Sequence, residues 1–324
     1  MNRIQKLFAE ADRPVLSVYF CAGHPTFDST LPVLEALDAA GVRMVEIGIP
    51  FSDPMADGPV IQDAATKALR NGMTLRRLFS QLRDVRAHTD MPLILMGYLN
   101  PIMQYGFESF CRSCQECGID GAIIPDLPYE EYVATYKPTA DAYGLDMIML
   151  ITPETDDERI RLIDSSINGF IYMVSSPGTT GAKDNFDSQR EYFERVAAMP
   201  LRNPRMIGFG ISNRATCEAA ASHAAGVIVG SRFIQLLDSC PTPAEAARKL
   251  VEMLGALHYG GSNTTDNPIP PRHETRHPDK TDTHRRLFRE FAVRILFSTV
   301  GRSARMEYFI YRRPFCCWRI CSCC

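Results

Sequence analysis

The stretch 44-MVEIGIPFSDPMADGPVIQ-62 combines a short apolar run with a long loop rich in proline and aspartate. In the run, Val45 and Ile47 fall on one face of an extended chain, and Glu46 falls on the other. Branched apolar residues suit the side of a parallel strand that packs against helices. The stretch therefore predicts a buried strand whose glutamate points away from the helices, toward the inside of the fold.

Similar apolar runs recur along the first 257 residues, and helical patterns lie between them. This alternation predicts an α/β protein with a parallel sheet covered by helices. Eight such units in about 250 residues are typical of a (β/α)8 TIM barrel, while a doubly wound open sheet is the competing arrangement. The expected strands are Val15–Cys21, Arg43–Ile49, Pro92–Tyr98, Gly121–Pro125, Asp146–Ile151, Gly169–Val174, Arg205–Gly208 and Gly226–Gly230. The expected helices are Phe27–Ala40, Leu75–His88, Glu108–Cys117, Tyr129–Tyr143, Asp156–Ser166, Phe186–Met199, Asn213–His223 and Pro243–Leu257.

The composition is that of an ordinary globular protein: of 324 residues, 45% are hydrophobic and 23% are charged. The net charge of -3 gives no indication of a nucleic-acid partner. The first residues contain no long apolar segment, so we expect no signal peptide. No apolar run approaches the ~20 residues that span a bilayer. We therefore expect no membrane association and a cytoplasmic location.

A composition change after Leu257 divides the chain into a barrel, residues 1–257, and a basic, Cys-rich tail, residues 258–324. The tail begins with a linker-like segment (258–271), and five of its last nine residues are cysteines. Residues 285–297 have the pattern of a basic amphipathic helix, which suits a membrane surface or a partner. The final cysteines lack the paired spacing of a structural zinc site. We expect a disordered tail, and its role is unknown.

Active sites of (β/α)8 barrels lie at the carboxyl ends of the strands, where Glu46, Asp53 and Asp57 are expected. A buried glutamate is either held by an arginine or by backbone donors, or it is a functional group with a raised pKa. Asp53 and Asp57 precede proline and glycine, which is typical of turns. Two carboxylates beside one pocket also suit general acid–base chemistry.

The ends of the last two expected strands predict an anion site. The motif 208-GFGIS-212 follows the seventh strand, and 229-VGS-231 leads from the eighth strand into a helix. Phosphate sites in these barrels are built from these two loops and a helix N-terminus, where backbone N–H groups face the anion. The sixth loop, 175-SSPGTTGAKDN-185, contains small and hydroxyl residues and is expected to act as a lid.

Two further groups have alternative interpretations. Cys111, Cys114 and Cys117 lie at helical spacing before Gly118, the expected end of that helix. They are either free cysteines that pack as small apolar side chains or metal ligands, and the helical spacing favours packing. His24, in a loop at the active-site end, either contacts substrate or shapes the turn.

These motifs resemble those of the tryptophan synthase alpha chain family, the indole-3-glycerol-phosphate lyases. The resemblance rests on 46-EIGIPFSDP-54, 56-ADGP-59, Gln62, 208-GFGIS-212, 229-VGS-231, Tyr98, 100-NP-101 and 125-PDLP-128, and it covers residues 1–257. It implies a (β/α)8 barrel that cleaves indole-3-glycerol phosphate to indole and glyceraldehyde 3-phosphate by a retro-aldol reaction, in tryptophan biosynthesis. It implies no metal and no organic cofactor.

The resemblance also assigns roles by position. Glu46 is the acid–base residue at indole C3 and the glycerol hydroxyl, and Asp57 is the carboxylate that accepts the indole N–H. The positions that match the family's phosphate-binding residues are Gly181, Gly210, Gly230 and Ser231. Those that match its indole pocket are Tyr19, Tyr172 and Phe209, and Thr180 is the lid threonine that meets Asp53 on closure.

The resemblance implies a beta subunit as partner, in an alpha2beta2 heterotetramer. A stand-alone lyase and a catalytically weak subunit that only activates its partner are the alternatives. The chain departs from the family in the sixth loop, 176-SPGTTG-181, at Tyr19 where phenylalanine is usual, at Met55 where leucine is usual, and in the whole tail. The hydroxyl of Tyr19 is expected to need a polar partner.

Overall fold

The computed structural model describes residues 2–174, 189–208 and 210–255. The expectations about the sixth-loop lid with Thr180 and Gly181, about Phe209 and about the tail from residue 258 therefore lie outside the described residues.

Eight parallel strands close into a barrel in which each strand pairs with the next and β8 returns to β1. The (β/α)8 prediction is thus confirmed, and the open sheet is wrong. Strand positions agree with the sequence to within two residues at each end. The strands are β1 (Val15–Cys21), β2 (Met44–Gly48), β3 (Leu93–Met96), β4 (Gly121–Ile123), β5 (Asp146–Ile151), β6 (Ile171–Val174), β7 (Arg205–Gly208) and β8 (Gly226–Val229).

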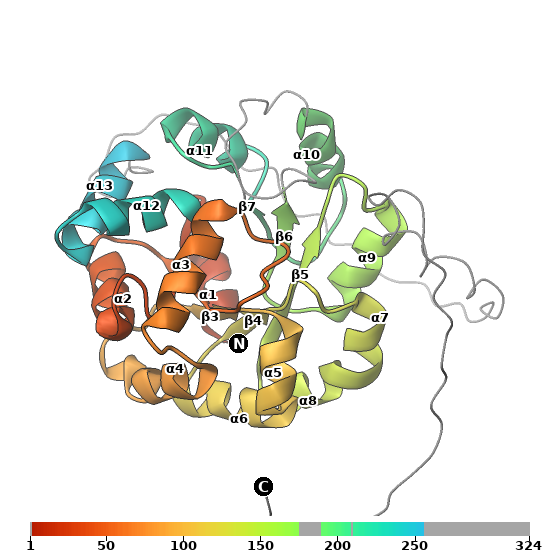
Figure 1. The fold of residues 1–324 in the computed structure, drawn as a ribbon. Helices are drawn as coiled ribbons and strands as arrows, with labels where there is room; N and C mark the ends of the chain where they lie inside the picture. The colour runs from red at the N-terminus through yellow and green to blue at the C-terminus, as the bar shows by residue number, and fades with distance from the viewer. Residues whose placement is uncertain (1, 175–188, 209, 256–324) are drawn as a thin grey trace, which may run out of the picture. The chain divides into compact units, whose positions relative to one another are not determined.

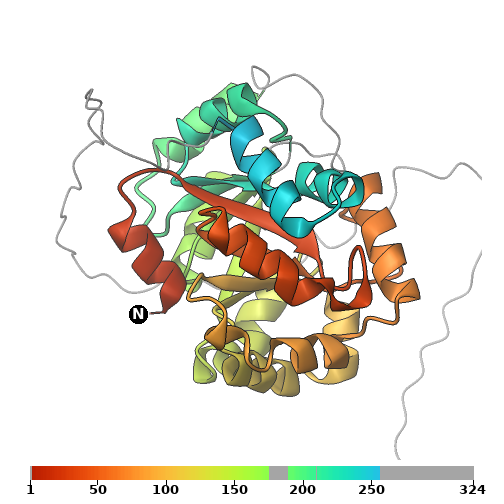
Figure 2. The same cartoon turned by 90° about the vertical axis from the view of Figure 1, so that its left-hand side faces the viewer.

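Helices surround the barrel (Figure 1), and α2 and α13 lie side by side on its outside (Figure 2). Their inward faces join the strands in one hydrophobic core. The helices are α1 (Arg3–Glu10), α2 (Thr30–Ala39), α3 (Pro59–Arg70), α4 (Leu75–Leu82), α5 (Leu99–Tyr105), α6 (Phe107–Cys117), α7 (Tyr129–Glu131), α8 (Lys137–Ala142), α9 (Asp157–Ser166), α10 (Arg190–Ala197), α11 (Arg214–Ala221), α12 (Ser231–Ser239) and α13 (Pro243–Met253).

Helices α1, α3 and α5 were not predicted from the sequence, and the predicted loop over residues 50–62 was too long. The loop ends at Gly58, and α3 begins at Pro59. Proline is favoured at the first helical position because its missing N–H would have no partner there. The proline that was assigned to the loop therefore begins the helix.

The expected helix Tyr129–Tyr143 is three consecutive segments, because a π-helical turn, η3 (Tyr132–Tyr136), separates α7 from α8. Pro138 follows this turn and has no N–H to donate to the preceding turn. A wider turn at this point accommodates the lost hydrogen bond. At α6 the expected end is confirmed, since Gly118 adopts a left-handed conformation with φ of 71°.

A buried carboxylate joins elements at the end of the barrel opposite the strand tips. Asp120, whose side chain is 3% exposed, pairs with Arg86 at 2.7 Å and with Arg3 of α1 at 3.3 Å. It also accepts a hydrogen bond from the backbone N–H of Leu93 at 3.0 Å. In the same region Asn2 donates to Asp146 at 2.6 Å. These contacts fix α1 over the start of β4 and β5.

We expect Asp120→Ala to lower the free energy of unfolding by about 3 kcal/mol, because it leaves the partly buried Arg86 charge without its carboxylate partner. Urea unfolding measures this change. Asp141→Ala is the matched control, since it removes an exposed pair with Lys137 and should cost less than about 1 kcal/mol. Equal effects of the two substitutions would contradict the structural role of Asp120.

Candidate active site

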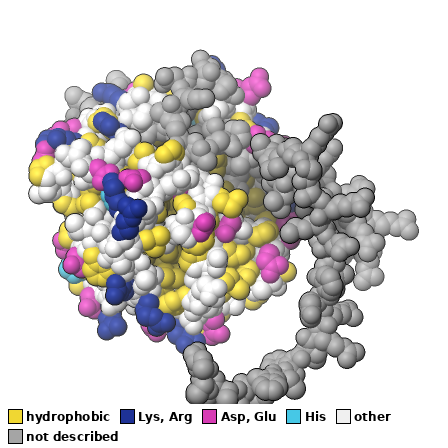
Figure 3. All heavy atoms as spheres, viewed as in Figure 1, with side chains coloured by type: hydrophobic (Ala, Val, Ile, Leu, Met, Phe, Trp, Pro, Cys, Tyr) yellow, Lys and Arg dark blue, Asp and Glu magenta, His cyan; other side chains and the backbone are white. Residues whose placement is uncertain are grey.

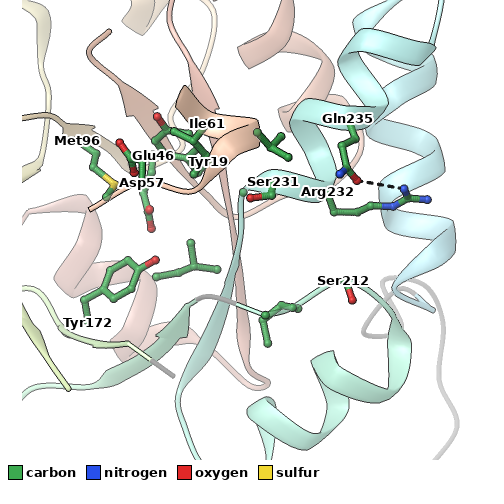
Figure 4. Close-up of a pocket in the computed structure, with 15 residues that line it drawn as sticks. Tyr19, Glu46, Asp57, Ile61, Met96, Tyr172, Ser212, Ser231, Arg232 and Gln235 are labelled. Atoms are coloured by element: carbon green, nitrogen blue, oxygen red, sulfur yellow. Dashed lines mark hydrogen bonds between the residues drawn. The ribbon is translucent and has the colours of Figure 1, made fainter. Parts of the chain in front are cut away.

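One pocket opens at the carboxyl ends of the strands (Figure 4), where a barrel places its site. Its volume is about 820 Å³ including its open mouth. Strands, loops and the first turns of α3 and α12 all contribute to it. The pocket is lined by Tyr19, Glu46, Asp57, Val60, Ile61, Met96, Tyr172, Gly210, Ile211, Ser212, Ile228, Gly230, Ser231, Arg232 and Gln235.

Glu46 reaches the pocket from the middle of β2 and is fully buried. One carboxyl oxygen, Oε1, accepts a hydrogen bond from the Ser17 hydroxyl at 3.2 Å. Among the described residues, Oε2 has no hydrogen-bond partner. Burial raises the pKa of Glu46 to about 8, and the hydrogen bond from Ser17 opposes this rise. Within the described ranges, neither an arginine nor a backbone donor holds this carboxyl group. At neutral pH the group is mostly protonated.

Asp57 approaches the same pocket from the loop before α3 and is 7% exposed. Its Oδ2 accepts a hydrogen bond from the Tyr98 hydroxyl at 3.0 Å, and that hydroxyl accepts one from the backbone N–H of Ala56 at 2.9 Å. Gln62 of α3 donates to the Asp57 carbonyl at 2.8 Å. Burial raises the pKa of Asp57 to about 6, and the bond from Tyr98 opposes the rise. Asp57 is therefore mostly ionised at pH 7, unlike Glu46.

Two tyrosines stand over glycines at the strand ends. A Cβ atom on Gly48 would lie 2.1 Å from the Tyr19 hydroxyl oxygen, and one on Gly208 would lie 2.1 Å from that of Tyr172. Only glycine leaves room for the two rings in these positions. Tyr19 also pairs in register with Glu46 across β1 and β2. Figure 4 shows Tyr172 on the opposite side of the pocket from Tyr19 and Glu46.

The end of β8 presents a helix N-terminus to the pocket. Gly230 is the residue before α12, and Ser231 is its first residue. Gly210 and Ser212, after β7, line the same region. The N–H groups of the first helical turn and the positive end of the helix dipole both favour an anion here. The anion site expected from the two glycine motifs would lie here, and it stays a prediction.

The structure brings seven of the predicted site residues together in the pocket: Tyr19, Glu46, Asp57, Tyr172, Gly210, Gly230 and Ser231. Asp53 does not line it and accepts a hydrogen bond from the neighbouring Ser52 hydroxyl. Ser17 beside Glu46 was not among the predicted site residues, and Tyr98 was named only as part of the resemblance, with no role at Asp57. Arg232 was not among the predicted site residues either. The sequence did contain a signal for Ser17, because it is a polar residue in the strand next to the one that carries the buried Glu46.

The other polar candidates lie outside the pocket. His24 is fully buried, with Nε2 3.3 Å from an Asp238 carboxylate oxygen of α12, and burial lowers its pKa. Cys111, Cys114 and Cys117 are buried and free, as expected for packing residues. In residues 2–174, 189–208 and 210–255, no three His, Cys, Asp or Glu side chains are grouped to hold a metal ion. No helix of those ranges is long and apolar enough to cross a bilayer.

Comparisons of the sequence and of the fold with known proteins all point to one family. The family model of the tryptophan synthase alpha chain matches residues 6–259. Tryptophan synthase alpha chains of Parabacteroides distasonis and Phocaeicola vulgatus are 63% and 59% identical to this chain, covering 78% of it and 99% of each relative. The crystal structure of the alpha chain from Legionella pneumophila is 33% identical, covers 81% of this chain and 100% of its own, and has a TM-score of 0.71. The chain belongs to the tryptophan synthase alpha chain family, whose members are lyases that cleave indole-3-glycerol phosphate.

Proposed function

We propose that Glu46 and Asp57 carry out the cleavage of indole-3-glycerol phosphate in this chain, as acid–base residue and as electrostatic stabiliser. The observation that carries the proposal is the difference between two carboxyl groups that line one pocket. Glu46 has a pKa of about 8 and Asp57 one of about 6, so the first is an acid and the second an anion near pH 7. Such a separation is typical of paired acid–base groups.

In the first step, the protonated Glu46 carboxyl donates its proton to C3 of the indole ring. The ring loses its aromatic character, and positive charge develops at the N–H group. The Asp57 carboxylate accepts a hydrogen bond from this N–H and stabilises the charge. The bond from the Tyr98 hydroxyl holds the Asp57 carboxylate in place while it does so.

In the second step, the ionised Glu46 removes the proton from the glycerol hydroxyl on the carbon bonded to C3. The oxygen forms the carbonyl of glyceraldehyde 3-phosphate, and the carbon–carbon bond breaks. The electron pair of that bond returns to the ring, which restores neutral, aromatic indole. Glu46 ends the cycle protonated, and no metal or organic cofactor is needed. Tyr19, Tyr172 and Phe209 would pack against the ring. The phosphate at the other end of the substrate would be bound by Gly181, Gly210, Gly230 and Ser231, and Thr180 of the sixth loop would meet Asp53 over the bound substrate.

We expect Glu46→Gln to lower kcat by at least about 100-fold, because the amide cannot donate and recover a proton. Asp57→Asn should also lower kcat strongly, with a smaller effect on substrate binding. Steady-state release of indole measures both. Glu194→Gln, at an exposed carboxylate of α10 paired with Arg190, is the control and should leave turnover unchanged. A folded Glu46→Gln protein that cleaves at the wild-type rate would overturn the assignment.

The pH dependence follows from the same two groups. Below about pH 6 Asp57 becomes protonated, and above about pH 8 Glu46 loses its proton. We expect kcat/KM to rise through the first value and to fall through the second, giving a bell-shaped profile. Asp57→Asn should remove the acidic limb and keep the basic one. A profile of Asp57→Asn that still rises through pH 6 would contradict this assignment.

Members of the family pair with a beta subunit. We propose an alpha2beta2 complex in the cytoplasm for this chain. The face that carries the pocket supports such a partner. Figure 3 shows hydrophobic side chains gathered on this face, below its centre. Met55, in the loop that carries Asp57, is 88% exposed, so a protein that covers this loop would bury it and act directly on Asp57.

Indole release by the full chain, with and without an added tryptophan synthase beta subunit, distinguishes the three possible roles. We expect strong activation by the beta subunit. Fast release without a partner would instead identify a stand-alone lyase. No release by the folded chain in either case would leave the subunit that only activates its partner. Met55→Glu, at an exposed position outside the pocket, should weaken activation and leave the partner-free rate unchanged.

A further inference from the structure

We propose that Arg232 is a further substrate-binding residue, whose guanidinium binds the phosphate of indole-3-glycerol phosphate. The inference rests on the function proposed above, which brings the phosphate to Gly230 and Ser231. It concerns a side chain to which the sequence motifs assign no role.

Arg232 follows Ser231 directly, so it belongs to the first turn of α12, and it lines the pocket. Figure 4 shows it beside Ser231 on the rim of the pocket, with its guanidinium turned toward Gln235. An arginine side chain one residue from the phosphate-binding position is long enough to turn inward. The phosphate would then meet the backbone of the helix N-terminus on one side and a guanidinium on the other.

The present contacts of Arg232 are weak. Its Nε lies 3.1 Å from the thioether sulfur of Met253, and its Nη1 lies 3.4 Å from the side-chain oxygen of Gln235. Both acceptors are neutral, and a thioether is a poor one. Within the described residues, no carboxylate oxygen lies within 4.0 Å of this guanidinium.

Two other helical arginines of the barrel, one in α11 and one in α13, differ in this respect. Arg214 of α11 and Arg248 of α13 each pair with a glutamate four residues later. The corresponding position after Arg232 is Leu236, so its own helix provides no counter-charge. Among the described residues, Arg232 therefore has no counter-charge at the edge of the pocket, whereas the charges of Arg214 and Arg248 are paired on the surface.

The position of Arg232 in the first turn of α12 also favours the binding of an anion. A cation in the first turn of a helix is unfavourable, because the helix dipole already makes that end positive. Arg232 and the N-terminus of α12 together produce a local positive potential that an anion would relieve. A phosphate dianion fits best, since it can accept two parallel hydrogen bonds from a guanidinium. Exchanging the thioether and amide contacts for these bonds is favourable.

Titration of the full chain with glycerol 3-phosphate, followed by calorimetry, tests the proposal. We expect Arg232→Gln to raise the Kd about tenfold, because it removes a charge-assisted hydrogen bond. The binding of the variant should also depend less on salt concentration. Arg232→Lys should recover part of the affinity. Arg248→Gln is the control, at an exposed arginine paired with Glu252, and should bind as the wild type does.

Kinetics separate this proposal from the one on which it rests. Arg232→Gln should raise KM for indole-3-glycerol phosphate about tenfold and leave kcat little changed. Indole has no phosphate, so it should inhibit the variant as strongly as it inhibits the wild type. Glu46→Gln should bind glycerol 3-phosphate normally and fail only in turnover. If Arg232→Gln binds glycerol 3-phosphate within twofold of the wild type, the role of Arg232 is wrong and the roles of Glu46 and Asp57 are untouched.

Discussion

The pairing of β8 with β1 closes the barrel, and every feature of the site depends on this closure. At the seam, the N–H of Val15 donates to the carbonyl of Ala225 at 2.9 Å. A Cβ atom on Gly226 would lie 2.4 Å from the carbonyl oxygen of Val15, so only glycine permits this approach. Closure leaves no free sheet edge and directs all eight strand ends to one opening. Groups that are 174 residues apart in the chain, as Asp57 and Ser231 are, thereby line a single pocket.

The same closure sets the chemistry of the two carboxyl groups. Glu46 lies on a strand and is enclosed by other strands, with one hydroxyl as its hydrogen-bond donor. Asp57 lies in a loop nearer to solvent, next to the Tyr98 hydroxyl. Desolvation is the main cause of the raised pKa in both, and it is greater for the strand residue. A glutamate inside the barrel and an aspartate at its rim can thus act as an acid and as an anion at one pH.

For the anionic end of the substrate we propose a different kind of interaction. Here backbone geometry is decisive, because the start of α12 is fixed by the strand that precedes it. An arginine side chain can add to the binding of the anion only where no carboxylate already neutralises its charge. Among the residues that the structure describes, Arg232 has no such partner, whereas Arg214 of α11 and Arg248 of α13 each have one. The pocket therefore brings together the acid Glu46, the anion Asp57 and the positive N-terminus of α12.

The sequence by itself determined the positions of the strands, the closed (β/α)8 architecture and the main residues of the pocket. Apolar runs and glycine motifs are local signals, and the long motif around Glu46 and Asp57 carried the family resemblance. The start of α3 and the turn before Pro138 were misjudged, because a proline reads as a loop signal until its place in a helix is known. Only the tertiary structure decided that Ser17 and Tyr98 contact the carboxyl groups and that Gly48 and Gly208 accommodate tyrosines. It also decided that, within the part of the chain the structure describes, no carboxylate pairs with Arg232. Those contacts join residues on different strands and helices, and their distances depend on how the barrel closes.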